Sequence, residues 1–572
     1  MMRLNAGETP KGVMAGLLFA ALLLRVVGIN FGPNHPDEHL IINHALAFGT
    51  GDLNPHMFYF PTLFLYLLFA VFGGFYALGR VSGHFSGVDQ FLQFFLQSPE
   101  TFYVLGRLVS VFFGVAAVWV VYHLGRELKN RAVGIWAALL LSVNFLHVRD
   151  SHFATMDITL TFFVLLSLLF ITQCFNGGGQ RAYWKAVIAA GVGTAAKYNG
   201  FLLLLPIGIT YLLVFFTKTW QENPVRAVSQ LLRVVLVSAA VFIAAFFCFS
   251  PFVILDFGTT WEFISRLYEI NRAFHVNWLN HLWMLYDSLG GFLFSLAVLG
   301  FLLQLRRLEA KRIVLVIFAV AYYAMITKAG QPFERYVLAL IPICLVWAAD
   351  FLEVLIGRFA YPGKGHVRRI LFGVLLLTAA LPKTLYQDYL FLQKNTREVT
   401  GEWISKNIRS GETLVLDDPG ECPRLVPARE QVRDQMAYLS AADINSSKKQ
   451  KRLQAFLDLP AYPEPNYQLY YLTENSKKRE FTMLTHTISY SPNELKRVGA
   501  NYLITSDMSM RANPKFYKTL KPYLELRFLI DPRRDKAKAM SPKGWTYLPI
   551  DRYFWNIARP GPLLYVFKLK IS

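Results

Sequence analysis

The sequence predicts an α-helical polytopic membrane protein with about eleven transmembrane helices, followed by a C-terminal extracytoplasmic α/β domain. Of the 572 residues, 54% are hydrophobic and only 17% are charged. The apolar residues gather into runs of roughly 17–23 residues, which as helices are long enough to cross about 30 Å of hydrocarbon. After about residue 390 these runs shorten, and charged residues and prolines become more frequent.

The predicted spans are the apolar runs at residues 13–31, 104–124, 132–148, 153–175, 184–199, 200–217, 234–255, 283–304, 313–328, 336–356 and 370–388. No small-residue cleavage site follows the first run, so we expect a retained helix rather than a signal peptide. With these spans, the clusters of Lys and Arg in the connecting segments all fall on one side of the membrane. Basic residues favour the cytoplasmic side, so we expect a cytoplasmic N-terminus and an extracytoplasmic C-terminal domain. The same rule explains the net charge of +20 without a nucleic-acid partner.

One further apolar segment, "FYFPTLFLYLLFAVFGGFYALG" at residues 58–79, is also long enough to span. If it crossed the membrane, every later basic segment would change side and the charge bias would invert. We therefore expect it to lie along the outer membrane interface or to re-enter the membrane. Residues 29–103 then form one large extracytoplasmic first loop of a transmembrane domain that covers residues 1–389.

Residues 390–572 are predicted to form the soluble α/β domain. The stretch "TREVTGEWISKNIRSGETLVLDD" indicates an amphipathic helix, a turn that contains glycine and a strand. The stretches "GANYLITSD" and "GPLLYVFKLK" indicate further strands. The 4 cysteines of the chain have neither a disulfide framework nor a metal-type spacing.

The first candidate site is "NHPDEH", directly after the first span. Proline followed by Asp37 and Glu38 is also how an ordinary helix begins, since acidic residues complement the helix dipole. Beside a membrane, however, a partly desolvated carboxylate can have a raised pKa and act as a general base near neutral pH. His35, Asp37 and His39 are also ligand types that several divalent metals accept, so a bound metal stays an open alternative.

The second group of candidates lies at the expected outer ends of later spans. Arg149, His152 and Asp157 belong to "RDSHFATMD", Lys197 to "GTAAKYNG" and Arg335 to "ERYVLALIP". Ionisable groups inside a membrane usually face a cavity or a partner. The structural alternatives are a pair between Asp157 and Arg149 or His152, and a Lys197 that extends to the interface.

Carboxylates and cations at one membrane face suit the transfer of a group from a lipid phosphate. A carboxylate can take the proton of the acceptor, while cations stabilise the phosphate as negative charge develops on it. Nucleotide sugars are expected in the cytoplasm, so a sugar donor used on the outer face would be carried by a lipid. Transporters and lipid flippases also need buried charges, but they more often have two related halves and broken helices, which this sequence does not show. A non-catalytic scaffold is a third interpretation.

The order of "HPDEH", "YFPTLFLYL", "GRLVSVFFGVAAVWVVYHLGREL", "RDSHFATMDITLTFF", "GTAAKYNG" and "ERYVLALIP" resembles the GT-C superfamily of membrane glycosyltransferases over residues 13–390. Within it, the chain looks like the branch of protein O-mannosyltransferases and the aminoarabinose transferase of lipid A. The resemblance implies a GT-C-like fold and an inverting transferase that uses a polyprenyl-phosphate sugar. The C-terminal α/β domain differs from the carbohydrate-binding insertion of eukaryotic mannosyltransferases, so the resemblance does not extend to a protein-mannosylating role.

The resemblance also implies roles for residues. Asp37 matches the catalytic base of the family's first-loop acidic motif, with Glu38 beside it. Asp157 matches the acidic residue that opens the fourth span, and Lys197 and Arg335 match phosphate-binding cations. Tyr59 of "YFP" would shape the donor site. Arg149 and His152 complete the predicted substrate-binding set.

The expected partners are a polyprenyl-phosphate sugar donor and a glycan, lipid or protein acceptor. The expected location is a plasma (inner) membrane that the chain crosses several times. No cofactor is indicated beyond the open question of a divalent metal. The sequence indicates neither which sugar is transferred nor which acceptor receives it.

Overall fold

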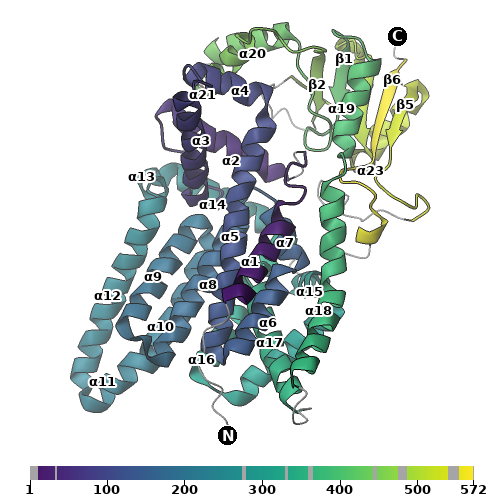
Figure 1. Cartoon of the computed structure of the whole chain (residues 1–572). Coiled ribbons are helices and arrows are strands. Elements are labelled where there is room, and N and C mark those ends of the chain that lie inside the picture. Colours follow the sequence, from purple (N-terminus) through teal and green to yellow (C-terminus); the bar gives the residue numbers. More distant parts are fainter. Residues whose placement is uncertain are drawn as a thin grey trace. The chain divides into compact units, whose positions relative to one another are not determined.

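The computed structural model describes residues 11–32, 35–272, 278–328, 333–358, 365–441, 447–473, 486–538 and 553–570. The chain divides into two compact units, each assembled from separate stretches of sequence (Figure 1). The first unit comprises Met1–Ile29, Gly51–Ala70 and Leu105–Asp388, and the second comprises Asn30–Thr50, Val71–Val104 and Tyr389–Ser572. Parts of the predicted first loop therefore pack in one unit with the C-terminal region, which the sequence did not indicate.

The helices confirm a multi-pass membrane protein. Within the described ranges, 7 helices or merged helical runs are long and apolar enough to cross a membrane, or up to 8 if the bent pair α6 (Arg131–Ser142) and α7 (Phe145–Ser151) counts as one span. The 7 are α3 (Leu63–Val81), α5 (Pro99–Leu128), the run Asp157–Ala196 with α8 (Asp157–Gln173) and α9 (Gly179–Ala196), the run Tyr198–Glu222 with α10 (Leu204–Tyr211) and α11 (Thr217–Glu222), α12 (Pro224–Phe249), α15 (Trp278–Arg307), and the run Val367–Asn407 with α18 (Gly365–Phe391) and α19 (Thr396–Asn407).

Three other predicted spans coincide with helices that are shorter or more charged. Helix α1 (Lys11–Val26) has 16 residues and α16 (Ala310–Ile326) has 17. Helix α17 (Ile341–Arg358) has 18 residues but carries Asp350, Glu353 and Arg358. The figure of about eleven spans and the orientation of the chain stay predictions. So does the interfacial placement of residues 58–79, most of which form α3.

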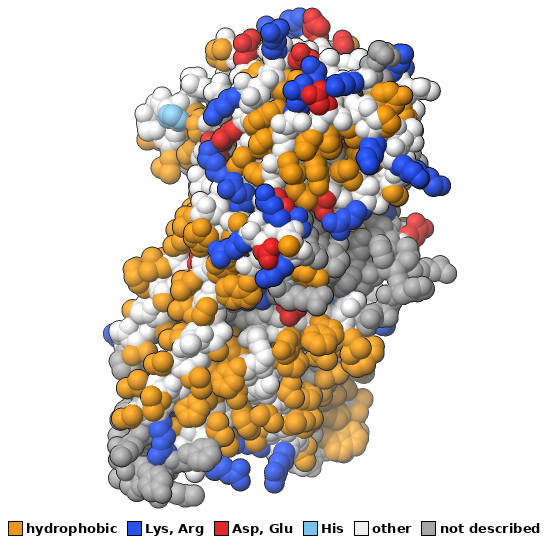
Figure 2. Space-filling model, turned by 90° about the vertical axis from the view of Figure 1, so that its right-hand side faces the viewer, with side chains coloured by type: hydrophobic (Ala, Val, Ile, Leu, Met, Phe, Trp, Pro, Cys, Tyr) orange, Lys and Arg blue, Asp and Glu red, His pale blue; other side chains and the backbone are white. Residues whose placement is uncertain are grey.

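The surface of the first unit is apolar where a lipid-facing surface is expected. Helix α18 exposes Val367, Ile370, Leu371, Val374 and Leu375, spaced three and four residues apart along one stripe. Figure 2 shows hydrophobic side chains covering most of this face of the helices. In a soluble protein such a stripe would be buried, whereas in a membrane it contacts lipid.

Small residues allow the helices of this unit to approach closely. A Cβ atom at Gly300 of α15 would lie 2.1 Å from the carbonyl oxygen of Trp347 in α17. A Cβ atom at Gly191 of α9 would lie 2.7 Å from the carbonyl oxygen of Phe242 in α12. Neither position accepts a larger side chain without moving a helix, which is typical of packing between membrane helices.

Short helices connect these elements or belong to the second unit. They are α2 (Pro36–Ala47), η1 (Phe48–Thr50), α4 (Val88–Gln97), η2 (Cys174–Gly178), η3 (Tyr198–Leu203), η4 (Leu212–Phe216), α13 (Phe252–Leu255), α14 (Phe257–Arg272), η5 (Glu334–Val337), α20 (Arg429–Ala441), α21 (Ser447–Leu457), α22 (Pro492–Arg497), α23 (Asp507–Ala512), α24 (Pro514–Leu520), η6 (Lys521–Tyr523) and η7 (Phe554–Asn556).

The second unit contains a six-stranded sheet, which confirms the predicted α/β character of the C-terminal region. The strands are β1 (Thr413–Leu416), β2 (Gln468–Leu472), β3 (Thr487–Ile488), β4 (Tyr502–Ser506), β5 (Leu524–Ile530) and β6 (Leu564–Leu569), in the order β3-β2-β1-β4-β6-β5. Strands β1 to β4 are parallel, and β6 and β5 add antiparallel pairs at one side. The three predicted strands correspond to β1, β4 and β6.

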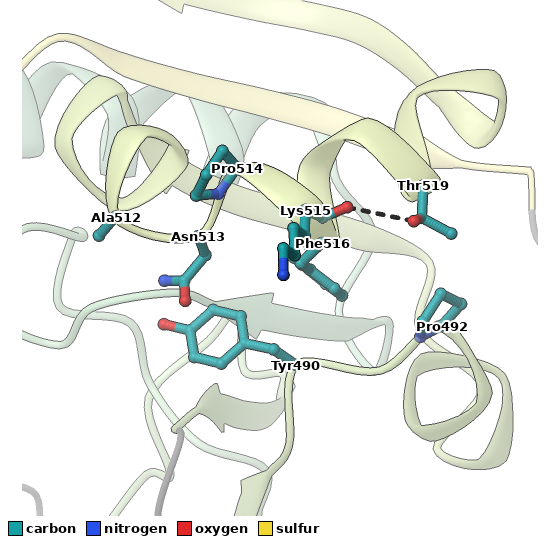
Figure 3. A pocket seen from close by; sticks show the side chains of 8 residues that line it. All are labelled: Tyr490, Pro492, Ala512, Asn513, Pro514, Lys515, Phe516 and Thr519. Carbon is teal, nitrogen blue, oxygen red and sulfur yellow. Dashed lines mark hydrogen bonds between the residues drawn. The ribbon is translucent and has the colours of Figure 1, made fainter.

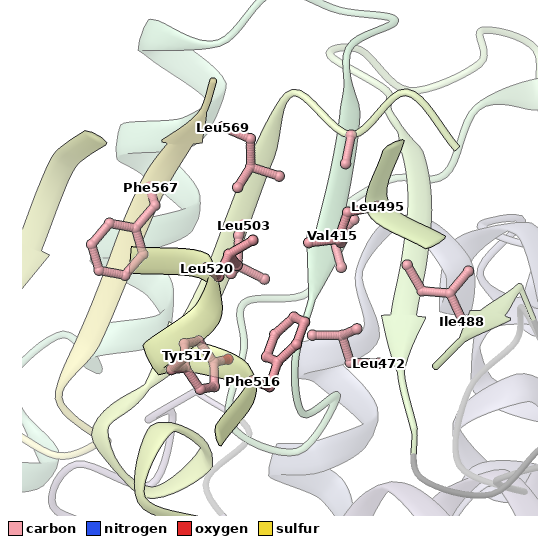
Figure 4. Packing of buried hydrophobic residues seen from close by; sticks show 11 residues of the cluster. Val415, Leu472, Ile488, Leu495, Leu503, Phe516, Tyr517, Leu520, Phe567 and Leu569 are labelled. Carbon is pink, nitrogen blue, oxygen red and sulfur yellow. The ribbon is translucent and has the colours of Figure 1, made fainter. Parts of the chain in front are cut away.

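Hydrophobic clusters cover both faces of this sheet. On one face, Leu495 of α22 and Phe516 and Leu520 of α24 pack against Val415 and Leu503 of the strands (Figure 4). On the other face, Ile404 and Ile408, at the end of α19, pack with Leu414, Leu416 and Ile504. The predicted glycine turn between α19 and β1 contains Gly411, whose φ of 89° favours glycine.

Candidate functional site

The acidic pair Asp37 and Glu38 lies in the first turn of α2. His35 precedes the helix, and its Nδ1 accepts a hydrogen bond from the Asp37 backbone N–H at 3.2 Å. The first-turn position places both carboxylates near the positive end of the helix dipole. Glu38 is fully buried, whereas Asp37 is half-buried. The structure thus confirms the helix-start interpretation and leaves Asp37 as the more accessible carboxylate.

His39, one turn further along α2, lies in a polar cluster of the second unit. Its ring nitrogens lie 3.1 and 3.0 Å from Asn43 Nδ2, and the Tyr103 hydroxyl lies 3.3 Å from its Nδ1. Arg424 donates to Tyr103 at 2.9 Å, and Arg452 donates to Asn43 at 2.8 Å. Burial, followed by the positive charges of Arg424 and Arg452, holds the pKa of His39 well below its usual range, so the imidazole is neutral at pH 7.

The two arginines of this cluster were not predicted from the sequence. They lie more than 300 residues after Tyr103, in a region whose basic residues resemble any solvated surface. Only the packing of the C-terminal region against α2 and against Tyr103 at the start of α5, within one unit, gives them a role. They tie the helix that carries Asp37 to the α/β region.

The described residues do not supply a metal site. No group of three or more His, Cys, Asp or Glu side chains within the described ranges is arranged to hold an ion. His35 already accepts the Asp37 N–H, and His39 faces Asn43 and Tyr103. We therefore derive no catalytic step from a metal at this position.

In the first unit, Asp157 and Lys197 form a buried ion pair. Asp157 opens α8, and Lys197 follows the last residue of α9 in an extended conformation, with φ −154° and ψ 135°. The Lys197 ammonium lies 2.6 Å from Asp157 Oδ1, and their side chains are 18% and 5% exposed. The alternatives that paired Asp157 with Arg149 or His152 were therefore wrong, because α8 and α9 pack side by side and present Lys197 instead.

The segment with Arg335 lies next to this pair. Lys197 Nζ lies 5.2 Å from the centre of the Tyr336 ring, which is within the range of a cation–π contact. Arg335 precedes Tyr336 in η5, is half-buried, and holds its guanidinium 4.7 Å from the centre of the Phe333 ring. The sequence indicated Arg335 but gave no signal for Tyr336 as the neighbour of Lys197.

The "YFP" element is attached to the same region through a backbone contact. The hydroxyl of Tyr198, the residue after Lys197, donates to the carbonyl oxygen of Phe58 at 3.2 Å. Tyr59 itself contacts α14: its ring meets the edge of Phe263 at 4.7 Å, and its hydroxyl accepts from Arg266 at 3.4 Å. The segments that carry Phe58, Asp157 and Tyr336 therefore contact either Lys197 or the residue after it.

Arg149 and His152 are buried and held by neighbouring groups. Arg149 is 1% exposed and forms an ion pair with Asp150 at 3.2 Å. His152 is fully buried, with Nδ1 2.9 Å from the Val148 carbonyl and Nε2 3.0 Å from the Val27 carbonyl. The latter contact links the end of α7 to the residue that follows α1. His152 thus stabilises the packing of α7, whereas Arg149 pairs within α7.

The predicted site residues divide between the two units of the fold. His35, Asp37, Glu38 and His39 belong to the second unit, whereas Tyr59, Arg149, His152, Asp157, Lys197 and Arg335 belong to the first. Within the first unit the structure brings Asp157, Lys197 and the Arg335 segment together. Within the second it joins the α2 helix to residues of the C-terminal region.

Comparison with known proteins gives partial sequence matches. Residues 71–250 match the family model described as dolichyl-phosphate-mannose-protein mannosyltransferase (PMT). An uncharacterised protein of Aquifex aeolicus is 24% identical over 251 residues, which are 43% of this chain and 47% of that protein. The match therefore spans about half the length of this curated relative.

Comparison with solved structures covers nearly the whole chain. ArnT from Cupriavidus metallidurans, solved bound to undecaprenyl phosphate, is similar with a TM-score of 0.51 and 12% identity, over 98% of both chains. The archaeal oligosaccharyltransferase AglB of Archaeoglobus fulgidus matches with a TM-score of 0.48 and 13% identity, over 96% of this chain and 77% of that one. The ArnT likeness shows the fold. Together with the match of residues 71–250 to the PMT model, it confirms the predicted resemblance to GT-C membrane glycosyltransferases.

Proposed function

We propose that this protein is an inverting glycosyltransferase that moves a sugar from a polyprenyl-phosphate donor to an acceptor at the outer face of a plasma (inner) membrane. The acceptor is a glycan, a lipid or a protein. The observation that carries the proposal is the cluster around Lys197, whose ammonium contacts Asp157 and Tyr336 and whose neighbour Tyr198 contacts Phe58. The sidedness rests on the distribution of basic residues between the spans.

In this proposal Lys197 and Arg335 hold the donor phosphate. An ammonium has three N–H donors, and the bond to Asp157 uses one of them. The ion pair fixes the ammonium in one orientation, while the 18% exposure of Lys197 leaves it the more accessible partner. As the bond from the sugar to the phosphate breaks, negative charge develops on the phosphate, and fixed cations stabilise that charge.

Asp37 acts as the general base. Its carboxylate takes the proton of the acceptor hydroxyl or amine while the acceptor atom bonds to the anomeric carbon. The bond from that carbon to the phosphate oxygen breaks, and its electron pair leaves with the polyprenyl phosphate. A single displacement of this kind inverts the anomeric configuration. Glu38, which is buried, supports the first turn of α2 beside Asp37.

The remaining candidates have supporting roles in the proposal. Arg149 and His152 are both buried and complete the substrate-binding set, and His152 also holds α7 against the segment that follows α1. Tyr59 shapes the donor region from its position against α14.

Mass spectrometry of reactions between the purified protein, a panel of polyprenyl-phosphate sugars and membrane extract tests the proposal. The expected result is release of polyprenyl phosphate together with a matching mass increment on an acceptor. The Asp37→Asn variant should lose this turnover while it remains folded and inserted in the membrane. Normal turnover by that variant would refute the role of Asp37, and intact donor across the panel would refute glycosyl transfer and favour transport.

A further inference from the structure

A cavity of about 570 Å³ lies in the α/β region of the second unit, among residues that the proposed function does not use. It is open to solvent and lined by Tyr490, Pro492, Ala512, Asn513, Pro514, Lys515, Phe516 and Thr519 (Figure 3). A volume of this size is in the range of small-molecule sites, roughly 300–1,000 Å³.

The position of the cavity follows from the topology of the sheet. Strands β1, β2 and β3 are added in one direction, and β4 then returns to the other side of β1. In open parallel sheets, ligands bind beyond the carboxyl ends of the strands, near such a reversal of strand order. The cavity is formed by the segments that follow the carboxyl ends of β3 and β4, so it lies on this edge.

Asp417, the residue after β1, fixes the walls of the cavity from behind. It is 1% exposed and accepts hydrogen bonds from the hydroxyls of Tyr490 at 2.5 Å, of Thr505 at 2.9 Å and of Tyr517. These three donors come from the segment after β3, from β4 and from α24. Tyr490 also meets the edge of the Phe516 ring at 5.3 Å. The aromatic wall is therefore held in place without a ligand.

The lining combines two aromatic rings, those of Tyr490 and Phe516, with polar groups and a cation. Figure 3 shows the side chains of Asn513 and Lys515 pointing toward Tyr490. The Thr519 hydroxyl donates to the Lys515 carbonyl at 3.1 Å, so the lone pairs of the hydroxyl oxygen stay available as acceptors. Lys515 is exposed and is the only charged residue among the eight described lining residues.

We propose that this cavity binds a saccharide that carries a negative charge, with its ring against Tyr490 and its charged group at Lys515. A sugar ring presents C–H groups that pack on an aromatic face and hydroxyls that the amide of Asn513 can bind. A neutral sugar leaves Lys515 unused, and a bare anion leaves the aromatic wall unused. The charged group is a phosphate or a carboxylate. The use of this site by the acceptor rests on the proposed transferase function. The binding of a saccharide there does not depend on that function.

Isothermal titration of the full-length protein in detergent micelles tests the site. The ligands are glucose 6-phosphate, glucuronic acid, glucose and inorganic phosphate. We expect at least one charged sugar to bind at least tenfold more tightly than glucose and than inorganic phosphate. The stronger of the two charged sugars identifies the preferred anionic group. Lys515→Met should lower the affinity for that sugar at least tenfold, and Asn513→Ala should lower it severalfold.

Lys538→Met is the matched control, since Lys538 is an exposed lysine outside the cavity, and it should leave the affinity unchanged. Equal affinity for inorganic phosphate and the sugars, or an unaltered affinity in Lys515→Met, would overturn the proposal. The titration is repeated with Asp37→Asn, which should bind like the wild type. Lost binding with intact transfer thus refutes the saccharide site alone, whereas intact binding without transfer refutes the transferase function alone.

Discussion

The ion pair between Asp157 and Lys197 allows a structural role to be separated from a role in catalysis. We consider Lys197→Met, Asp157→Asn and the double variant. Methionine keeps much of the length and the apolar stem of lysine without its charge, and asparagine keeps the shape of aspartate. Any difference among the three proteins therefore reports on charge and hydrogen bonding rather than on volume.

The expected cost to stability follows from burial. Asp157 is 5% exposed, so Lys197→Met leaves a buried carboxylate whose cation 2.6 Å away has been removed. Breaking a buried pair in this way costs roughly 3–5 kcal/mol, and we expect about 3 because Lys197 is 18% exposed. Asp157→Asn should cost less, about 1–2 kcal/mol, since the amide still accepts a hydrogen bond from the ammonium. The double variant should cost less than the sum, with a coupling of about 2 kcal/mol.

Two assays are needed. The midpoint of unfolding in a denaturing-detergent titration, followed by tryptophan fluorescence, gives the order of stabilities. Release of polyprenyl phosphate under subsaturating donor gives the activity. If Lys197 contacts the donor phosphate, both variants that lack it should lose at least a hundredfold in activity, including the more stable double variant. Recovery of activity in the double variant to near the level of Asp157→Asn would refute the phosphate role and leave Lys197 a structural partner of Asp157.

Three further predictions test other parts of the structure. Burial raises the pKa of Glu421 from 4.5 to about 7 in the folded state, so the folded state binds the proton more tightly and stability should fall as pH rises from about 4.5 to 7. At about 1.4 kcal/mol per pKa unit, this loss of stability is on the order of 3 kcal/mol. Glu421→Gln should remove that slope from a pH series of unfolding midpoints, and an unchanged slope would contradict the prediction. Gly300→Val should destabilise the first unit by at least about 2 kcal/mol, because its Cβ would overlap the Trp347 carbonyl. The control Gly16→Val should leave stability unchanged, because the space around Gly16 is open. Equal unfolding midpoints for the two variants would show that α15 and α17 are not packed as described. Asp350→Asn should reduce the free energy of unfolding by about 3 kcal/mol, because Asp350 is fully buried between Arg312 at 2.5 Å and Lys129 at 2.7 Å. The variant that folds should keep the wild-type KM for donor. A raised KM would place this cluster in the donor site.

Much of this protein was determined by its sequence alone. Apolar runs long enough to span the membrane predicted a multi-pass protein, because hydrocarbon accepts only backbone that is internally hydrogen-bonded. The helix, glycine turn and strand at residues 396–416 were predicted from local signals, including Gly411. The order of the charged motifs indicated a lipid-phosphate glycosyltransferase, and it singled out Asp157 and Lys197 because charge inside an apolar run is costly.

Only the tertiary structure decided the partners of these residues. Lys197 pairs with Asp157, forty residues earlier, and contacts Tyr336, because helix packing and not sequence distance sets which side chains meet. The same holds for Arg452, which reaches Asn43 of α2, and for Arg424, which reaches Tyr103 at the start of α5. It also holds for Asp417, which joins Tyr490 to Tyr517. Local patterns specify which groups must find a partner, and long-range packing selects the partner.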